Sequence, residues 1–213
     1  MFAGHFGLAA GVKALDTGLL AKRRMTGSAK SAPVRPDVPL WALMLSAQLL
    51  DVGFAFLVIA RAESFGGGGG YGVGWIQAYY THSLAGALLI AAIAGLLAAQ
   101  WWGQQGGLLI AAMVFSHWLL DLLVHRPDLP ILPGNLGNLP LLGFGLWNTP
   151  AVSAALEALL VVGGAVFYFA SLLARTQGAT AERLGQRGRA LVAGSVTGAL
   201  LVLALVTSVL GIG

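Results

Sequence analysis

The chain has 213 residues, of which 57% are hydrophobic and only 9% are charged, with a formal net charge of +4. About a quarter of the residues of a soluble domain are charged, so this composition excludes an ordinary soluble domain and indicates a membrane protein. The absence of cysteine excludes disulfides, thiolate metal sites and a cysteine nucleophile. Histidine and carboxylate side chains remain as candidate metal ligands.

Runs of about 20 apolar residues predict membrane-spanning helices. A weakly polar run at the N-terminus carries His5, Lys13 and Asp16, and five clearer runs follow residue 39. We expect an all-α integral membrane protein with one domain, a polytopic bundle of five transmembrane helices plus an N-terminal spanning or re-entrant helix. The predicted spans are residues 2–20, 40–60, 79–102, 108–125, 151–174 and 190–212.

Two connectors are unusual in composition. Residues 61–71 include five consecutive glycines, Gly66 to Gly70, which predicts a flexible connector with no fold of its own. Residues 127–150 are rich in proline, glycine, asparagine and leucine, and are too broken for a helix. Long loops of this kind are often functional, so we interpret this one as a lid or a short re-entrant element at the membrane surface.

The distribution of basic residues predicts the orientation. Five Lys and Arg residues lie in the loop 21–39 and four in the loop 175–189, whereas the loops 61–78 and 126–150 hold one each. Because loops rich in Lys and Arg stay in the cytoplasm, 21–39 and 175–189 are predicted to be cytoplasmic and the two unusual connectors to lie outside.

With this topology, most ionisable side chains within the spans fall at one depth. Such side chains are costly inside a membrane and usually mark a functional site. The residues predicted to share this extracytoplasmic layer are all four histidines and three carboxylates: His5, His82, His117, His125, Asp51, Asp121 and Glu157.

The most informative stretch carries His117, Asp121 and His125 at intervals of four. Residues four apart on a helix can ligate one ion, as His pairs do in zinc enzymes. His117 and His125 differ by about 12 Å of helix rise, so one ion with a separate catalytic histidine, or two ions, would fit this pattern.

These considerations predict a divalent metal site, with zinc as the candidate ion. The predicted metal ligands are His82, His117 and Asp121, and the predicted catalytic residues are Glu157, His125 and Asp51. Such a site would activate water for attack on an ester or phosphoester, with a histidine or carboxylate as general base. The simpler interpretations are an interfacial role for a lone histidine such as His5 or His82, and helix capping or ion pairing for Asp51.

Several motifs resemble a known family. They are the HxxxD pattern at 117–121, the following HRPDLP, the GLWNTP before the helix with Glu157, and the Thr-His-Ser at 81–83. Together they resemble bacterial membrane-bound metal-dependent hydrolases of the YdjM-like, LexA-binding inner-membrane type. The resemblance extends to about Ala174, and the five-glycine connector and the weakly polar first helix depart from the family pattern.

The resemblance implies a multi-pass protein of the bacterial inner (cytoplasmic) membrane with a polar core of His82, His117, Asp121 and Glu157. The first functional hypothesis is a metal-dependent hydrolase that acts on a lipid or lipid-linked ester near the outer leaflet. The alternative is a non-catalytic accessory subunit of a larger membrane complex, which the glycine-rich helices and six tryptophans favour. The expected partners are membrane lipids or other membrane subunits, and not nucleic acid, because no folded basic module is present.

Overall fold

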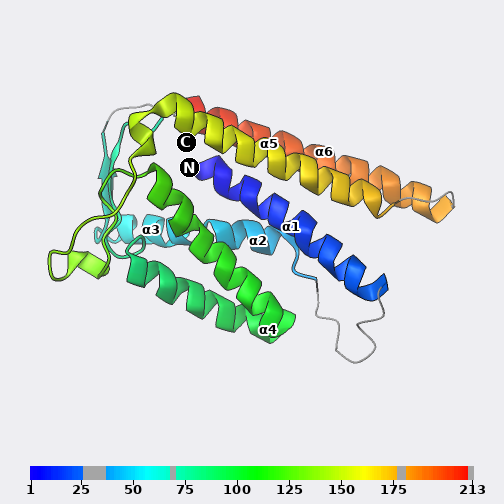
Figure 1. The fold of residues 1–213 in the computed structure, drawn as a ribbon, viewed down its shortest axis with the longest axis horizontal. Coiled ribbons are helices and arrows are strands. Elements are labelled where there is room, and N and C mark those ends of the chain that lie inside the picture. The colour runs from blue at the N-terminus through cyan, green and yellow to red at the C-terminus, as the bar shows by residue number, and fades with distance from the viewer. Residues whose placement is uncertain (26–36, 68–70, 177–180, 211–213) are drawn as a thin grey trace.

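The computed structural model describes residues 1–25, 37–67, 71–176 and 181–210. This part of the chain is mostly helical, which confirms the all-α prediction (Figure 1). The helices are α1 (Phe2–Met25), α2 (Leu40–Ala47), α3 (Leu49–Ile59), α4 (Leu84–Val124), α5 (Pro150–Ala174) and α6 (Ala181–Leu210). The short strands β1 (Ser64–Gly66) and β2 (Trp75–Gln77) form an antiparallel hairpin, and single 3-10 turns occur at Pro133–Asn135 and Leu146–Asn148.

Three of the described helices are long and apolar enough to cross a membrane: α4, α5, and the part of α6 from Gly185 to Leu210. The bent pair formed by α2 and α3 provides a fourth if the two together count as one span. The protein therefore has the helices of a membrane protein. Helix α1 matches the predicted N-terminal run, although it continues to Met25.

The predicted span 40–60 is divided by a bend of 50° between α2 and α3. The break is at Gln48, whose backbone lies outside the helical region at φ −110° and ψ 7°. The Gln48 side-chain amide donates a hydrogen bond of 2.8 Å to the carbonyl of Phe2, so the break is tied to the start of α1.

Helix α4 contains most of the predicted spans 79–102 and 108–125 as two arms joined at Gly103, but it begins only at Leu84 and ends at Val124. Gly103 has φ 68° and ψ 174°, a conformation outside the helical region that glycine adopts readily. The two arms pack closely at Gly95, where there is no room for a side chain. A Cβ on Gly95 would lie 2.9 Å from the carbonyl oxygen of Gly107. The first arm begins at Leu84, where the hydroxyl of Ser83 accepts the N–H of Gly86 at 3.0 Å.

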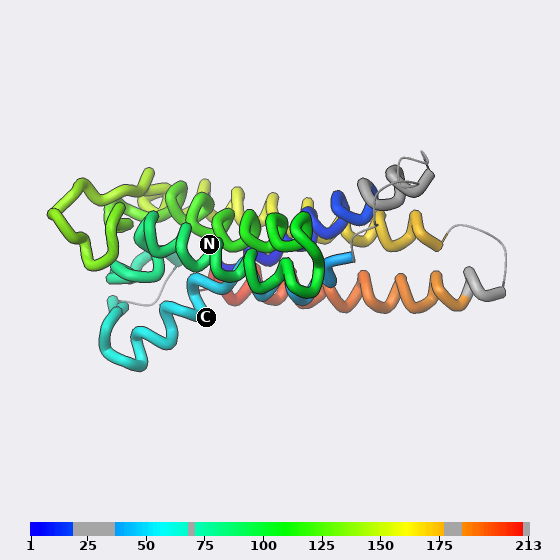
Figure 2. Tube along the Cα trace, turned by 90° about the horizontal axis from the view of Figure 1, so that it is seen from below, coloured from blue at the N-terminus to red at the C-terminus, as the bar shows by residue number. Residues whose placement is uncertain are grey.

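Helix α1 packs along α5, and α6 covers the same side of the molecule (Figures 1 and 2). At the crossing, a Cβ on Gly7 would lie 2.5 Å from the carbonyl oxygen of Leu160, and Gly164 of α5 contacts Gly7 directly. Ala3, Val161 and Leu201 bury their side chains in this α1–α5–α6 interface.

The N-terminus, the β-hairpin and the start of α5 lie at one end of the molecule, whereas the C-terminal ends of α1 and α5 lie at the other (Figure 1). The prediction that residues 61–71 have no fold of their own is wrong for the described part, because Ser64–Gly66 pairs with Trp75–Gln77. The Arg126 guanidinium also donates to the carbonyls of Gly72 at 2.7 Å and Gly74 at 3.3 Å. These bonds fix the hairpin against the end of α4. Gly68–Gly70 lie outside the described residues.

Candidate metal centre

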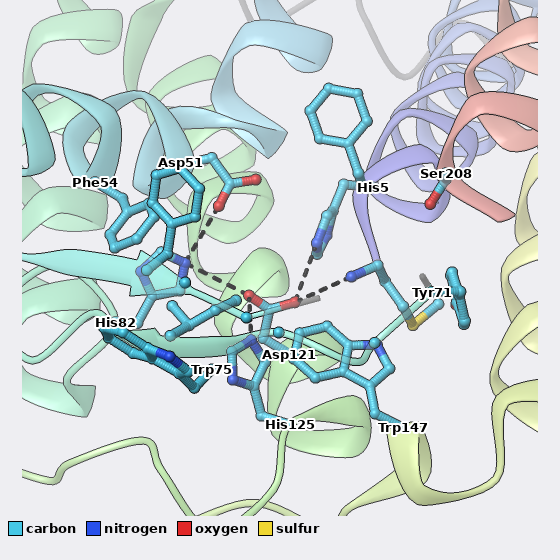
Figure 3. A pocket seen from close by; sticks show the side chains of 18 of the residues that line it. His5, Asp51, Phe54, Tyr71, Trp75, His82, Asp121, His125, Trp147 and Ser208 are labelled. Atoms are coloured by element: carbon cyan, nitrogen blue, oxygen red, sulfur yellow. Dashed lines mark ion pairs between the residues drawn. The ribbon is translucent and has the colours of Figure 1, made fainter. Parts of the chain in front are cut away.

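The fold brings the polar residues together because the helix ends that carry them lie at the same end of the molecule (Figure 1). His82 precedes the first arm of α4, while His117 and Asp121 lie near the end of the second arm, so the turn at Gly103 returns them to His82. Asp51 reaches the group from α3, and His5 reaches it from the first turns of α1 (Figure 3).

Three of these side chains form a compact triangle of potential ligand atoms. The Nε2 atoms of His82 and His117 are 3.3 Å apart, and Oδ2 of Asp121 is 3.5 Å from the first and 3.1 Å from the second. Two ligands bound at about 2.0–2.1 Å to one tetrahedral ion are separated by about 3.3–3.4 Å. The triangle formed by His82, His117 and Asp121 therefore has the dimensions that can hold a metal ion.

Asp51 forms a second triangle on the same histidine edge. Its Oδ1 lies 3.4 Å from Nε2 of His82 and 3.5 Å from Nε2 of His117. The Asp51 side chain is 37% exposed, whereas that of Asp121 is 5% exposed. Asp51 therefore lies on the open side of the group and Asp121 on the closed side.

His5 supports Asp121 from the opposite side. Its Nε2 is 3.3 Å from Oδ1 of Asp121, and its ring stacks on that of His117 with centroids 3.8 Å apart. The backbone nitrogen of Met1 is 3.8 Å from the same oxygen. Because these contacts are to Oδ1, they leave Oδ2 of Asp121 facing His82 and His117. His5, His117 and Asp121 also meet the distances of a possible ion-binding group.

The tautomer of His117 follows from its outer contact. Nδ1 of His117 lies 2.6 Å from the carbonyl oxygen of Ala47, the last residue of α2. A carbonyl oxygen can only accept, so Nδ1 carries the proton and the lone pair of a neutral imidazole is on Nε2, facing the carboxylates. The break between α2 and α3 makes this bond possible, since carbonyls at a helix C-terminus lack an intrahelical partner.

His125 lies at the end of α4, beside the triangle. Its Nδ1 is 2.8 Å from Oδ1 of Asp128, and its Nε2 is 3.8 Å from Oδ2 of Asp121. The ring also packs against Trp147, with centroids 4.3 Å apart. Because the Asp128 carboxylate accepts the hydrogen bond of Nδ1–H, the lone pair of a neutral His125 ring is on Nε2, on the side of the cavity.

Glu157 is fully buried but has different partners from the other predicted site residues. Its Oε1 accepts the backbone N–H groups of Ala3 at 2.7 Å and Gly4 at 3.1 Å. The hydroxyl of Ser208 donates to its Oε2 at 3.2 Å. The first N–H groups of a helix need such acceptors, so Glu157 anchors the start of α1, which carries His5, to α5.

A cavity of about 570 Å³ lies over the polar group (Figure 3). Its polar lining includes His5, Asp51, His82, Asp121 and His125. Its aromatic lining comprises Phe2, Phe54, Phe65, Tyr71, Trp75 and Trp147. Burial raises the pKa of the Tyr71 phenol above its ordinary value, so this wall presents a neutral hydroxyl group.

Sequence reasoning missed several parts of this site. The β-hairpin, expected to be an unfolded connector, supplies much of the cavity wall, whereas the predicted lid 127–150 contributes Trp147. Asp128 was not singled out, although the spacing of three from His125 placed it within reach. No sequence signal links Glu63 to Thr81 and His82, because their contact depends on the path of the chain after α3.

No protein-family model, curated protein or solved structure matches this chain. The resemblance to the YdjM-like hydrolases therefore stays a sequence-based prediction.

Proposed function

We propose that this protein is a membrane-embedded, metal-dependent hydrolase that cleaves an ester or phosphoester bond of a lipid or lipid-linked substrate near the outer leaflet. The observation that carries the proposal is the convergence of buried His82, His117 and Asp121, of which His82 and Asp121 line an aromatic-walled cavity. Buried polar groups of this kind are costly unless they are paired or bind an ion.

We infer a single divalent ion. Nε2 of His117 belongs to both groups of possible ligands, one with His5 and Asp121 and one with Asp51 and His82. An imidazole nitrogen has one lone pair, and Nδ1 of His117 is already bonded to Ala47, so His117 serves one ion. Zinc suits a set of neutral histidines and carboxylates at these separations.

The remaining chemistry belongs to the chain's own residues. A divalent ion would supply Lewis acidity and an activated water near neutral pH. His125 presents Nε2 to the cavity and is held by Asp128, which suits a general base. Asp51, on the open side, would serve as a further ligand or a second proton acceptor.

A lipid substrate is supported by the walls of the cavity. Phe2, Phe65 and Trp75 line it and remain 50%, 65% and 51% exposed, respectively. Large exposed aromatic groups around a polar site are characteristic of a surface that contacts a membrane or an apolar ligand. A membrane lipid could bring its ester bond to the polar end while its chains remain among these side chains.

We also propose how the chain lies in a bacterial inner membrane. Each arm of α4 has about 20 residues, enough to cross the hydrocarbon core, so α4 would contribute two spans, and α2–α3, α5 and α6 one each. Helix α1 would lie beside α5 as a sixth segment. The basic segments 21–39 and 175–189 were predicted to be loops, but the first includes the end of α1 and the second the start of α6. Both segments would be cytoplasmic, which puts the cavity on the outer side.

Metal content tests the proposal directly. The full-length protein, purified without chelator and assayed by plasma mass spectrometry, should contain about one zinc or other divalent ion per chain. His117→Ala and Asp121→Ala should each lose it, because each removes one vertex of the triangle. Tyr71→Phe, which alters the cavity wall without touching the triangle, serves as the matched control and should retain the ion.

A metal content of the wild-type protein no higher than the background would contradict the proposal of a metal-dependent hydrolase. If such a protein also copurified in fixed stoichiometry with other membrane proteins, the accessory-subunit alternative would replace it. Loss of metal in the variants, together with hydrolysis of a lipid ester by the wild type alone, would support the enzyme.

A further inference from the structure

Glu63 is a buried carboxylate outside the metal centre, in the turn that follows α3. Glu63 is only 4% exposed, and no sequence pattern identified it as a candidate site residue. Oε1 of Glu63 accepts the backbone N–H groups of Tyr80 at 2.7 Å and Thr81 at 2.9 Å. These two groups can only donate, so the carboxylate is oriented by the backbone immediately before His82.

The Thr81 hydroxyl connects Glu63 to His82. It lies 2.9 Å from Oε2 and 3.2 Å from Oε1 of Glu63, and 2.9 Å from Nδ1 of His82. A hydroxyl has one proton to donate. Because that proton is directed to the Glu63 carboxylate, the hydroxyl oxygen must accept the contact with His82, and the proton of that hydrogen bond belongs to Nδ1 of His82.

We propose that Glu63 and Thr81 are positioning residues that hold His82 in its Nδ1–H tautomer, with the lone pair of Nε2 directed at His117, Asp51 and Asp121. The tautomer is a property of the metal-free protein as well. The role of this lone pair as a metal ligand rests on the proposed function.

The tautomer matters because of what Nε2 faces. Nε2 of His82 lies 3.3 Å from Nε2 of His117 and 3.5 Å from Oδ2 of Asp121. In the other tautomer, a proton on Nε2 of His82 would occupy the place of the ion. Outer hydrogen bonds of this kind fix the ring orientation and tautomer of metal-binding histidines. His117 is held in the same way by the carbonyl of Ala47, at 2.6 Å, so both histidines are prepared from outside.

The first experiment reads the tautomer without metal. The metal-free full chain, labelled with ¹⁵N-histidine in lipid nanodiscs, is examined by NMR at a pH at which the His82 ring is neutral, and a His82→Gln variant assigns its signals. We expect the Nδ1–H form for His82, and loss of this fixed form in Thr81→Val. An Nε2–H signal for His82, which would result if Glu63 donated to Thr81, would overturn the inference.

The second experiment measures zinc affinity. Thr81→Val should weaken zinc binding by about 10- to 100-fold, whereas Thr81→Ser, which keeps the hydroxyl, should remain within about threefold of the wild type. In a His82→Ala background, Thr81→Val should cause no further loss, because Thr81 acts through His82. Equal losses in the two backgrounds would indicate a merely structural effect and would overturn the positioning role.

Two provisions keep the test decisive. If Thr81→Val does not fold, Glu63→Gln replaces it, because the amide oxygen can still accept backbone N–H groups while the carboxylate charge is lost. If the wild type binds no zinc, the hydrolase proposal fails, and the NMR result alone decides whether Glu63 and Thr81 set the His82 tautomer.

Discussion

Asp128 determines which nitrogen of His125 faces the cavity. The pair has the arrangement of a carboxylate–histidine dyad, with 2.8 Å between Oδ1 and Nδ1. His117 and His82 have outer partners of their own, so the three rings direct Nε2 inward for the same reason. His5 differs, because its Nε2 contacts the far oxygen of Asp121. The histidines are thus distinguished by their hydrogen bonds rather than by their burial.

Replacing Asp128 with asparagine should separate proton transfer from metal binding. The amide can donate to Nδ1 and favour the Nε2–H tautomer of His125, which cannot accept a proton from the cavity. We expect kcat for a lipid ester to fall about 100-fold while metal content stays at the wild-type level. Asp128→Glu, which restores a carboxylate, should recover part of the activity. Unchanged kcat in Asp128→Asn would exclude His125 as the base.

The sequence allowed part of this site to be predicted, and the rest depends on rotation about helix axes. His117 and Asp121 could be paired from their spacing, and His82 and Asp51 could be placed from their depth in the spans. Depth alone also placed Glu157 in the same layer, but it cannot tell which side of α5 the carboxylate faces, and the structure directs it to the start of α1. Gln48 interrupts the apolar run 40–60 in the sequence, but a single polar residue does not predict the 50° bend found there.

Helix α1 crosses α5 with close backbone contact. Gly7 and Gly164 let the two backbones meet. In membranes, small residues at such crossings permit the close packing that associates helices. The position of His5, two residues before Gly7, depends on this crossing and on the bonds from Glu157 to Ala3 and Gly4.

Gly7→Ala should therefore force α1 away from α5. Its Cβ would lie 2.5 Å from the carbonyl oxygen of Leu160, a backbone atom that cannot rotate aside. We expect a destabilisation of about 1–3 kcal/mol, seen as a lower thermal midpoint in detergent. Gly163→Ala is the matched control on α5, since a Cβ there meets no described atom within 4 Å. Equal midpoints for the two variants would contradict the close crossing.

At the scale of the whole molecule, the cavity has a polar inner end and outer walls that carry exposed aromatic side chains. Its inner end is polar and held by α1, α3 and α4, whereas its outer walls come largely from the β-hairpin. Arg126 fixes the hairpin to the end of α4 through the carbonyls of Gly72 and Gly74. The hairpin is thus a wall of the cavity, and the exposed aromatic groups on it form the boundary with the surrounding lipid.

Changing this boundary should affect long substrates more than short ones. The double variant Phe65→Ser, Trp75→Ser should lower kcat/KM for a long-chain lipid ester in vesicles about tenfold, because that factor corresponds to about 1.4 kcal/mol of lost apolar contact with the two aromatic groups. A short-chain, water-soluble ester should be cleaved at the wild-type rate. Phe144→Ser removes another exposed aromatic group, one that does not line the cavity, and it should change neither rate. Parallel losses for both substrates would contradict a role in lipid entry.

The turn at Gly103 also bears on the order in which the site is completed during synthesis. His117 and Asp121 lie on the second arm of the α4 hairpin and His82 lies two residues before its first arm, so the three can meet as soon as that hairpin has left the ribosome and entered the membrane as a unit. His5 emerges first, but its helix is fixed by Gly164 and Glu157 of α5, which emerges later. His5, the first histidine to be synthesised, would therefore be the last to reach its position in the site.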